Sequence, residues 1–215
     1  MSVEPGRTNT RDRVIWITRT AVFMALLISV QFFSAAFGQL VTGSLVNMVL
    51  MVAVMTGGLT TGLAVSIAAP FLAFAIGVGI QQLPMIPVIA GGNAVLVLVW
   101  HIFSKIYEQK RDVLLVAAII AAALAKFAVM YFIGSLVLVP LLGLPPRVAQ
   151  MFSYPQLITA IVGGALGALV LPLVSRAANT GGNQRIKTAN LSHKLAFLAA
   201  AVIFAAALVV GIVLL

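Results

Sequence analysis

The chain has 215 residues, of which 62% are hydrophobic and only 8% are charged, and its mean hydropathy is +1.18. These values exclude a soluble domain with a polar surface and predict a helical membrane protein with about six or seven spans. The net charge of +9 does not predict nucleic-acid binding, because in a membrane protein the placement of Lys and Arg matters more than their sum. The sequence has no cysteine, which excludes disulfides and thiolate metal sites.

Apolar segments follow one another along the whole chain. They lie at about 15–37, 43–56, 59–79, 85–104, 113–142, 154–175 and 194–215. The second is short for a span, and the fifth is so long that we expect it to tilt or to bend near Pro140. The predicted fold is an all-α membrane protein with a six-helix transmembrane bundle and an additional C-terminal seventh span. Its parts are a basic N-terminus at 1–14, the membrane domain at 15–175, a basic linker at 176–193 and the last span at 194–215.

Basic residues predict the orientation of the bundle. They cluster before the first span, after the fourth and after the sixth, at Arg7, Arg11, Arg13, Arg19, Lys105, Lys110, Arg111, Arg176, Arg185, Lys187 and Lys194. An even number of crossings separates these three places, so the positive-inside rule makes that side cytoplasmic, with the N-terminus inside. Only Arg147 then faces outward, and only Lys126 lies within a span. The acidic residues fall in the same cytoplasmic flanks, at Glu4, Asp12, Glu108 and Asp112.

A cleaved signal peptide is the alternative interpretation of the first span, since Ser34-Ala35-Ala36 could serve as a cleavage site. The apolar run, however, is longer than the roughly 7–15 residues of a signal-peptide core. Removing it would also upset the even count of crossings on which the orientation depends. We therefore expect the first segment to span the membrane.

Polar residues gather in the connections that are expected to face outward, at 37–44, 79–85 and 142–156, as solvent-exposed loops commonly do. Inside the spans, Asn47, Asn93 and Lys126 are costly unless they pair or face a water-filled cavity. Lys126 costs about 2.5–3.5 kcal/mol on insertion scales and has no acidic residue in the membrane to pair with. We expect its partner to be a carbonyl, water or a bound anion, and snorkelling to the interface is the rival interpretation.

The connection at 142–156 carries three prolines and Tyr154, and it is interpreted either as a stiff lid or as a structural connector. Motifs for nucleotide binding, zinc proteases and serine hydrolases are absent from the sequence. His101 and His193 lack neighbours at metal-ligand spacing. We therefore expect neither an enzyme nor a cofactor.

The helix plan and several motifs resemble the S components of energy-coupling factor (ECF) transporters, the prokaryotic ABC-type uptake systems for vitamins and related micronutrients. RTAVFMALL at 19–27 resembles the AxxxA motif of the family's first helix. The run FGQLVTGSLVNMVL at 37–50, then Pro70, and then IPVIAGGNAVLVLVW at 86–100 resemble S components without a known substrate. The family has six helices, so the resemblance implies no role for 194–215.

The resemblance implies a substrate-capturing subunit in a prokaryotic plasma membrane. Such a subunit takes its substrate from outside, docks on a membrane-embedded T component and topples, driven by two ATPase subunits. The small residues Ala21 and Ala25 would form the docking stripe, with packing inside the bundle as the alternative; Gly163 and Gly167, spaced alike, are expected to serve such packing. By position, the family's pocket maps onto Asn47, Asn93, Lys126, Arg147, Tyr154 and Gln156.

The substrate is not identified by these residues. Two basic side chains without acidic partners favour a carboxylate or phosphate on the ligand, but a neutral ligand held by the amides and Tyr154 stays open. The alternative functions are an ATP-independent transporter or facilitator of small organic anions, with Lys126 and Arg147 as its charge relay, and a membrane scaffold subunit.

Overall fold

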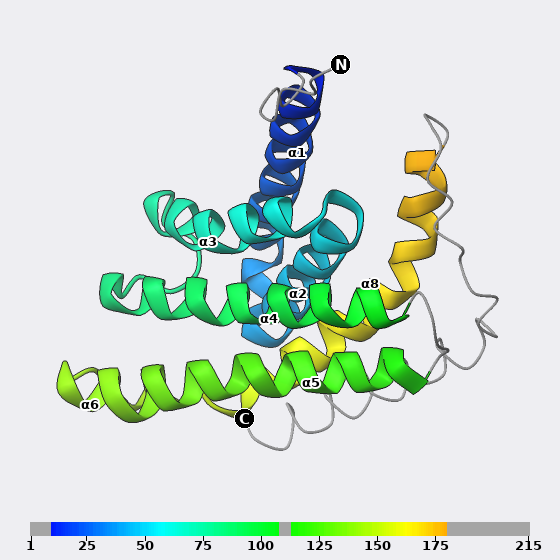
Figure 1. The fold of residues 1–215 in the computed structure, drawn as a ribbon. Coiled ribbons are helices and arrows are strands. Elements are labelled where there is room, and N and C mark those ends of the chain that lie inside the picture. Colours follow the sequence, from blue (N-terminus) through cyan, green and yellow to red (C-terminus); the bar gives the residue numbers. More distant parts are fainter. Residues whose placement is uncertain (1–9, 108–112, 180–215) are drawn as a thin grey trace, which may run out of the picture.

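The computed structural model describes residues 10–107 and 113–179, and within these ranges the chain is helical apart from short turns (Figure 1). The α-helices are α1 (Thr10–Ser34), α2 (Gly38–Gly57), α3 (Leu59–Ala75), α4 (Ile86–Tyr107), α5 (Val113–Val129), α6 (Val139–Leu141), α7 (Pro146–Met151) and α8 (Tyr154–Asn179). Two 3₁₀ turns, η1 (Ala35–Phe37) and η2 (Leu83–Met85), and a π-helix, η3 (Met130–Leu138), complete the list. The prediction of an all-α fold is confirmed for this part of the chain.

The helices have the length and composition of membrane spans. Among the described residues, four stretches are long and apolar enough to cross a membrane: Thr10–Gly57, Leu83–Phe103, Leu115–Leu141 and Pro146–Val174. The first of them contains both α1 and α2, and α3 is a shorter apolar helix. These helices are those of a membrane-embedded protein. The number of crossings and the cytoplasmic N-terminus stay predictions, and the predicted seventh span at 194–215 lies outside the described residues.

The turn between α1 and α2 is much tighter than the sequence suggested. Helix α2 begins at Gly38 rather than at 43, so most of the connection expected at 37–44 is helical. Gly38 has a φ of +81°, which only glycine adopts readily, and this lets the chain reverse within one residue. The hydroxyl of Thr42 donates to the carbonyl of Ser34 at 2.8 Å, which ties the start of α2 to the end of α1. Helix α2 has 20 residues and is therefore longer than the apolar segment expected at 43–56.

Near Pro140, where the sequence predicts a tilt or a bend, the helix changes type. The α5 helix continues into η3, and the N–H of Val139 donates to the carbonyl of Gly134, five residues back. Proline has no N–H, so the α-helical pattern cannot run unchanged through Pro140, and helix α6 ends one residue later at Leu141. The widened stretch begins at Met130, one turn beyond Lys126. Stretches of π-helix occur often at functional sites.

Helix α2 occupies the centre of the bundle, between α1, α3, α4 and α8, and its residues from Val49 to Val54 are all buried. Helices α2 and α8 pack in a regular register that depends on glycine. A Cβ atom on Gly163 would lie 2.5 Å from Cβ of Asn47, and one on Gly167 would clash with the sulfur of Met51. These two glycines thus serve packing inside the bundle, as expected, since small residues let membrane helices approach closely.

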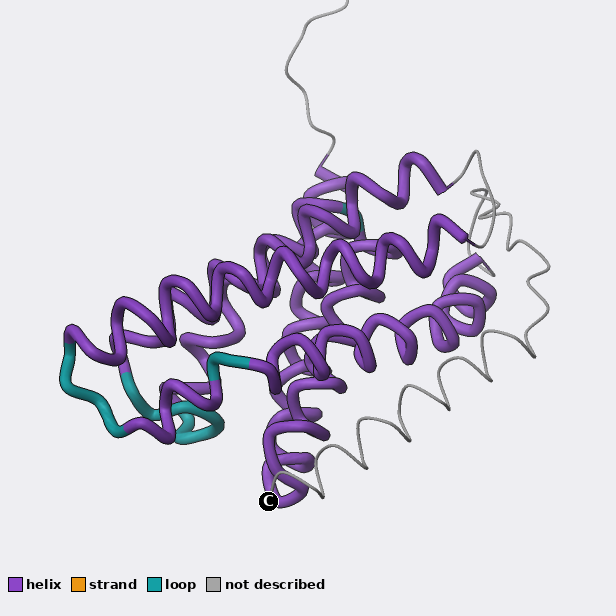
Figure 2. Tube along the Cα trace, turned by 90° about the horizontal axis from the view of Figure 1, so that it is seen from below, coloured by secondary structure: helices purple, strands orange, loops and turns teal. Residues whose placement is uncertain are grey.

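One end of the bundle is built from the connections that follow α1, α3 and α6. Figure 2 shows loops drawn in teal gathered at one end of the long helices. A buried cluster joins these connections to the helices, formed by Met85, Val88, Met130, Val139, Val148 and Phe152. The expected loop at 142–156 is partly helical here, because α7 begins at Pro146 and α8 begins at Tyr154. We call this end, with residues 35–39, 76–85 and 142–156, the loop end of the bundle.

Candidate functional site

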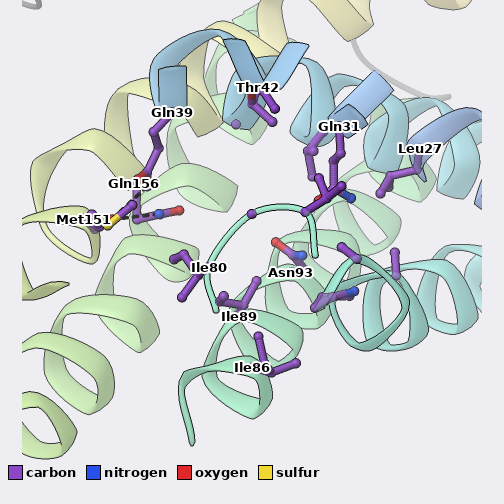
Figure 3. A pocket seen from close by; sticks show the side chains of 18 of the residues that line it. Leu27, Gln31, Gln39, Thr42, Ile80, Ile86, Ile89, Asn93, Met151 and Gln156 are labelled. Carbon is purple, nitrogen blue, oxygen red and sulfur yellow. Dashed lines mark hydrogen bonds between the residues drawn. The ribbon is translucent and has the colours of Figure 1, made fainter. Parts of the chain in front are cut away.

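A cavity of about 350 Å³ extends from the loop end into the bundle (Figure 3). Six polar residues from α1, α2, α4, α5 and α8 line it: Gln31, Gln39, Thr42, Asn93, Lys126 and Gln156. Between them the wall is apolar, with Val46, Ile80, Ile86, Ile89 and Met130. Such an apolar cavity with a few placed polar groups is the usual form of a small-molecule site, and its volume is at the lower end of the range of about 300–1,000 Å³.

Lys126 reaches the cavity wall from α5 and binds two amide oxygens. Its Nζ donates to Oδ1 of Asn47 at 2.7 Å and to Oδ1 of Asn93 at 2.8 Å. Lys126 is 3% exposed, Asn47 is 1% exposed and Asn93 is 4% exposed, so the whole cluster is buried. The structure therefore brings together the three polar residues that the sequence placed inside spans. Lys126 pairs with amide carbonyl groups here and does not snorkel to an interface.

The lysine cluster, which we define as Asn47, Asn93 and Lys126, is rich in donors and poor in acceptors. Its three side chains all carry N–H groups, whereas both of its amide oxygens already accept from Lys126. Within the described part of the chain, Nδ2 of Asn47 is buried and has no hydrogen-bond partner. The sequence has no Asp or Glu between residues 13 and 107 or after residue 112. The cluster thus has more N–H donors than acceptors and carries no negative charge.

A second polar group lies at the loop end of the cavity. The Nε2 atoms of Gln39 and Gln156 both donate to the backbone carbonyl of Met151, at 3.0 and 2.8 Å. In Figure 3 these two side chains come together beside Met151. Each amide keeps its Oε1 atom as an acceptor, and Gln156 is buried. We call Gln39 and Gln156 the glutamine pair.

The structure adds cavity residues that the sequence reasoning did not select. Gln31 lines the cavity from α1, and Oε1 of this residue lies 4.0 Å from where a Cβ of Gly79 would be. From the sequence, Gln39 and Thr42 belong only to the connection at 37–44 that is expected to face outward. Gln31 stands out in the sequence only as a single glutamine near the end of an apolar segment. Such a residue is also common at membrane interfaces, so its position alone does not indicate a cavity.

Two of the predicted substrate-binding residues lie away from this cavity. Arg147 is exposed on the short helix α7, and Tyr154 is 45% exposed at the first position of α8. Neither side chain belongs to the cavity wall, whereas Asn93, Lys126 and Gln156 do. Asn47 stands behind the wall and contacts it through Lys126. A role for Arg147 and Tyr154 in substrate binding stays a prediction.

The predicted docking residues are on the outside of the bundle. Ala21 and Ala25 are exposed on α1, and Val22 and Leu26 beside them are 59% and 46% exposed. Figure 1 shows the N-terminal half of α1 projecting away from the other helices. Among residues 10–107 and 113–179, no helix covers these two alanines, so packing inside the bundle, the alternative interpretation, is not seen in this part of the chain.

No group of three or more His, Cys, Asp or Glu side chains that could hold a metal ion occurs in residues 10–107 and 113–179. Comparisons of the chain with protein-family models, with curated proteins and with solved structures found no match. Function must therefore be argued from the cavity and from the surface of the bundle.

Proposed function

We propose that this protein is the substrate-capturing membrane subunit of an ECF-type uptake transporter for a vitamin or a similar micronutrient. In this proposal the substrate enters the cavity from the loop end, which faces outward. The loaded subunit then docks on a T component in the membrane of a prokaryote, and two ATPase subunits supply the energy. The chain itself holds no cofactor and catalyses no reaction.

The observation that carries the proposal is the lysine cluster at the inner wall of the cavity. A buried lysine that only held helices together would destabilise the bundle, because the desolvation cost of its ammonium group exceeds the gain from two hydrogen bonds to neutral groups. Polar residues inside membrane spans usually mark a substrate or ion pathway. A lysine that borders a cavity of ligand size, with neutral partners only, fits a binding site better than a scaffold.

The exposed stripe on α1 supports the same proposal. Ala21 and Ala25 stand one turn apart among larger exposed side chains. Small residues at this spacing let another membrane helix approach closely, where packing rather than hydrophobicity drives association. A lone facilitator has no need of such a stripe, whereas a subunit that docks on a membrane partner does.

The test is to express the chain with T and ATPase subunits of an ECF module and to measure uptake and co-purification. We expect the complex to co-purify and uptake to stop when the ATPase is inactivated. Uptake that continues with the inactive ATPase would contradict the proposal and favour an ATP-independent transporter of small organic anions. An assembly without any uptake or ligand binding would favour a scaffold subunit.

A further inference from the structure

The lysine cluster selects for the charge of the ligand. It presents several N–H donors, one cationic side chain and no carboxylate. In a site of low dielectric, a ligand with one negative charge offsets the charge of Lys126, whereas a dianion leaves an excess negative charge that is costly to bury. A carboxylate also offers the acceptors that the amide nitrogen of Asn93, on the cavity wall, can use. The chemistry of this end fits a single carboxylate.

The distance between the two polar groups sets the length of the ligand. Gln39 and Asn47 are eight residues apart on α2, and Gln156 is seven residues from Gly163, which packs against Asn47. At 1.5 Å per residue of helix, these spacings place the glutamine pair roughly 10–12 Å from the lysine cluster. The cavity thus has two polar ends about this far apart.

The glutamine pair fits a neutral hydrogen-bonding group at the other end. Each Nε2 donates one N–H to the carbonyl of Met151, and each amide keeps its Oε1 atom as an acceptor for a ligand hydroxyl or N–H. Both side chains are neutral, so an anionic group there would be buried without a counter-charge, which is costly. The wall between the two ends is apolar, with Ile80, Ile89 and Met130.

We propose that the cavity binds a small monocarboxylate whose carboxylate lies at Lys126 and Asn93 and whose distal hydroxyl or N–H group lies at Gln39 and Gln156. An apolar body joins the two ends of this ligand. This inference rests on the proposed function only in taking the cavity as the substrate site.

Pairs of compounds that differ only at the acid test the inference on the purified full chain in detergent. The probes are pantothenate and panthenol, biotin and biotinamide, and nicotinate and nicotinamide, each measured by thermal shift and then by titration. A ligand that binds the folded state raises its apparent stability. We expect a shift from pantothenate or biotin, which carry a distant hydroxyl or N–H group, and none from their neutral partners or from the short nicotinate. Phosphopantothenate, with an anion at the distal end, should also give none.

Variants of the two polar ends complete the test. Lys126→Met should weaken binding of the acid at least about tenfold, and Gln39→Met or Gln156→Met should weaken it about two- to tenfold. Either glutamine variant keeps the carbonyl of Met151 paired by the other glutamine, so both should fold. Gln150→Met is the matched control, because Gln150 is exposed on α7 and does not line the cavity; its affinity should be unchanged.

Three outcomes would overturn the inference: equal shifts from an acid and its neutral partner, no shift from either long acid, or acid binding unaffected by the glutamine variants. Failure of the proposed function appears in a different assay. The isolated chain could bind acids specifically while uptake continues with an inactivated ATPase. That result would support this inference and overturn the ECF proposal. ATPase-dependent uptake of a neutral compound would support the ECF proposal and overturn this inference.

Discussion

Substituting Gly163 of α8 with alanine should force α8 apart from α2, the helix that carries Asn47 of the lysine cluster. A Cβ atom at this position would lie 2.5 Å from Cβ of Asn47 and 2.5 Å from the backbone oxygen of Ser44. It would also lie 3.0 Å from the backbone nitrogen of Met48. Ordinary contacts begin at 3.4 Å, so α2 must move by roughly 0.9 Å. Two of the three atoms belong to the backbone, and no side-chain rotation can relieve the clash.

The free energy of unfolding should fall by about 1–2 kcal/mol. Overpacking of a well-packed core costs about 1–3 kcal/mol. Alanine recovers up to about 1 kcal/mol of this, because glycine is the weaker helix former. Movement of α2 also displaces Asn47 from Nζ of Lys126, so the affinity of the cavity for its ligand should fall together with stability.

In the assay, the purified chain is unfolded in mixed detergent micelles by increasing fractions of SDS. The loss of helical signal measures unfolding. Gly91→Ala is the matched control, since a Cβ atom on Gly91 of α4 would meet nothing within 4 Å. The control should be as stable as the original chain or more stable by up to about 1 kcal/mol. If Gly163→Ala unfolds at the same SDS fraction as Gly91→Ala, the close packing of α2 against α8 is refuted.

Further predictions concern the site, the docking stripe and the C-terminus. Asn93→Asp should fold and be at least as stable, because its carboxylate would take the place of an oxygen that lies 2.8 Å from the lysine nitrogen. It should lose the thermal shift from an acidic ligand, and a retained shift would contradict the charge argument. Ala21→Leu and Ala25→Leu should leave ligand binding unchanged and abolish co-purification with a T component, whereas Ala36→Leu, an exposed alanine elsewhere, should keep both. Unchanged co-purification of the stripe variants would refute the docking role. A tag after residue 215 should be reached only from outside the cell if 194–215 spans the membrane, and labelling from the cytoplasm would refute that span.

The helices and the membrane environment could be predicted from the sequence because both depend on local properties. An apolar run of about 20 residues is long enough for a helix to cross the bilayer, and this holds wherever the run occurs in a chain. The cost of one buried charge likewise singles out Lys126 without knowledge of its neighbours. Helix ends were less predictable. The positive φ angle of Gly38 allows a tight turn, and α2 therefore begins where the sequence predicted a loop.

The partners of Lys126 were decided only by tertiary structure. Asn47 is 79 residues from it in sequence and Asn93 is 33 residues away, and their oxygens meet its Nζ because α4 packs against both α2 and α5. The same packing leaves Arg147 outside the cavity wall and brings Gln31 into it. Hydropathy tells which residues are costly to bury, since transfer from water depends on the residue alone. Which groups then relieve that cost depends on helix contacts across the bundle, and those come from shape complementarity such as that of Gly163 against Asn47.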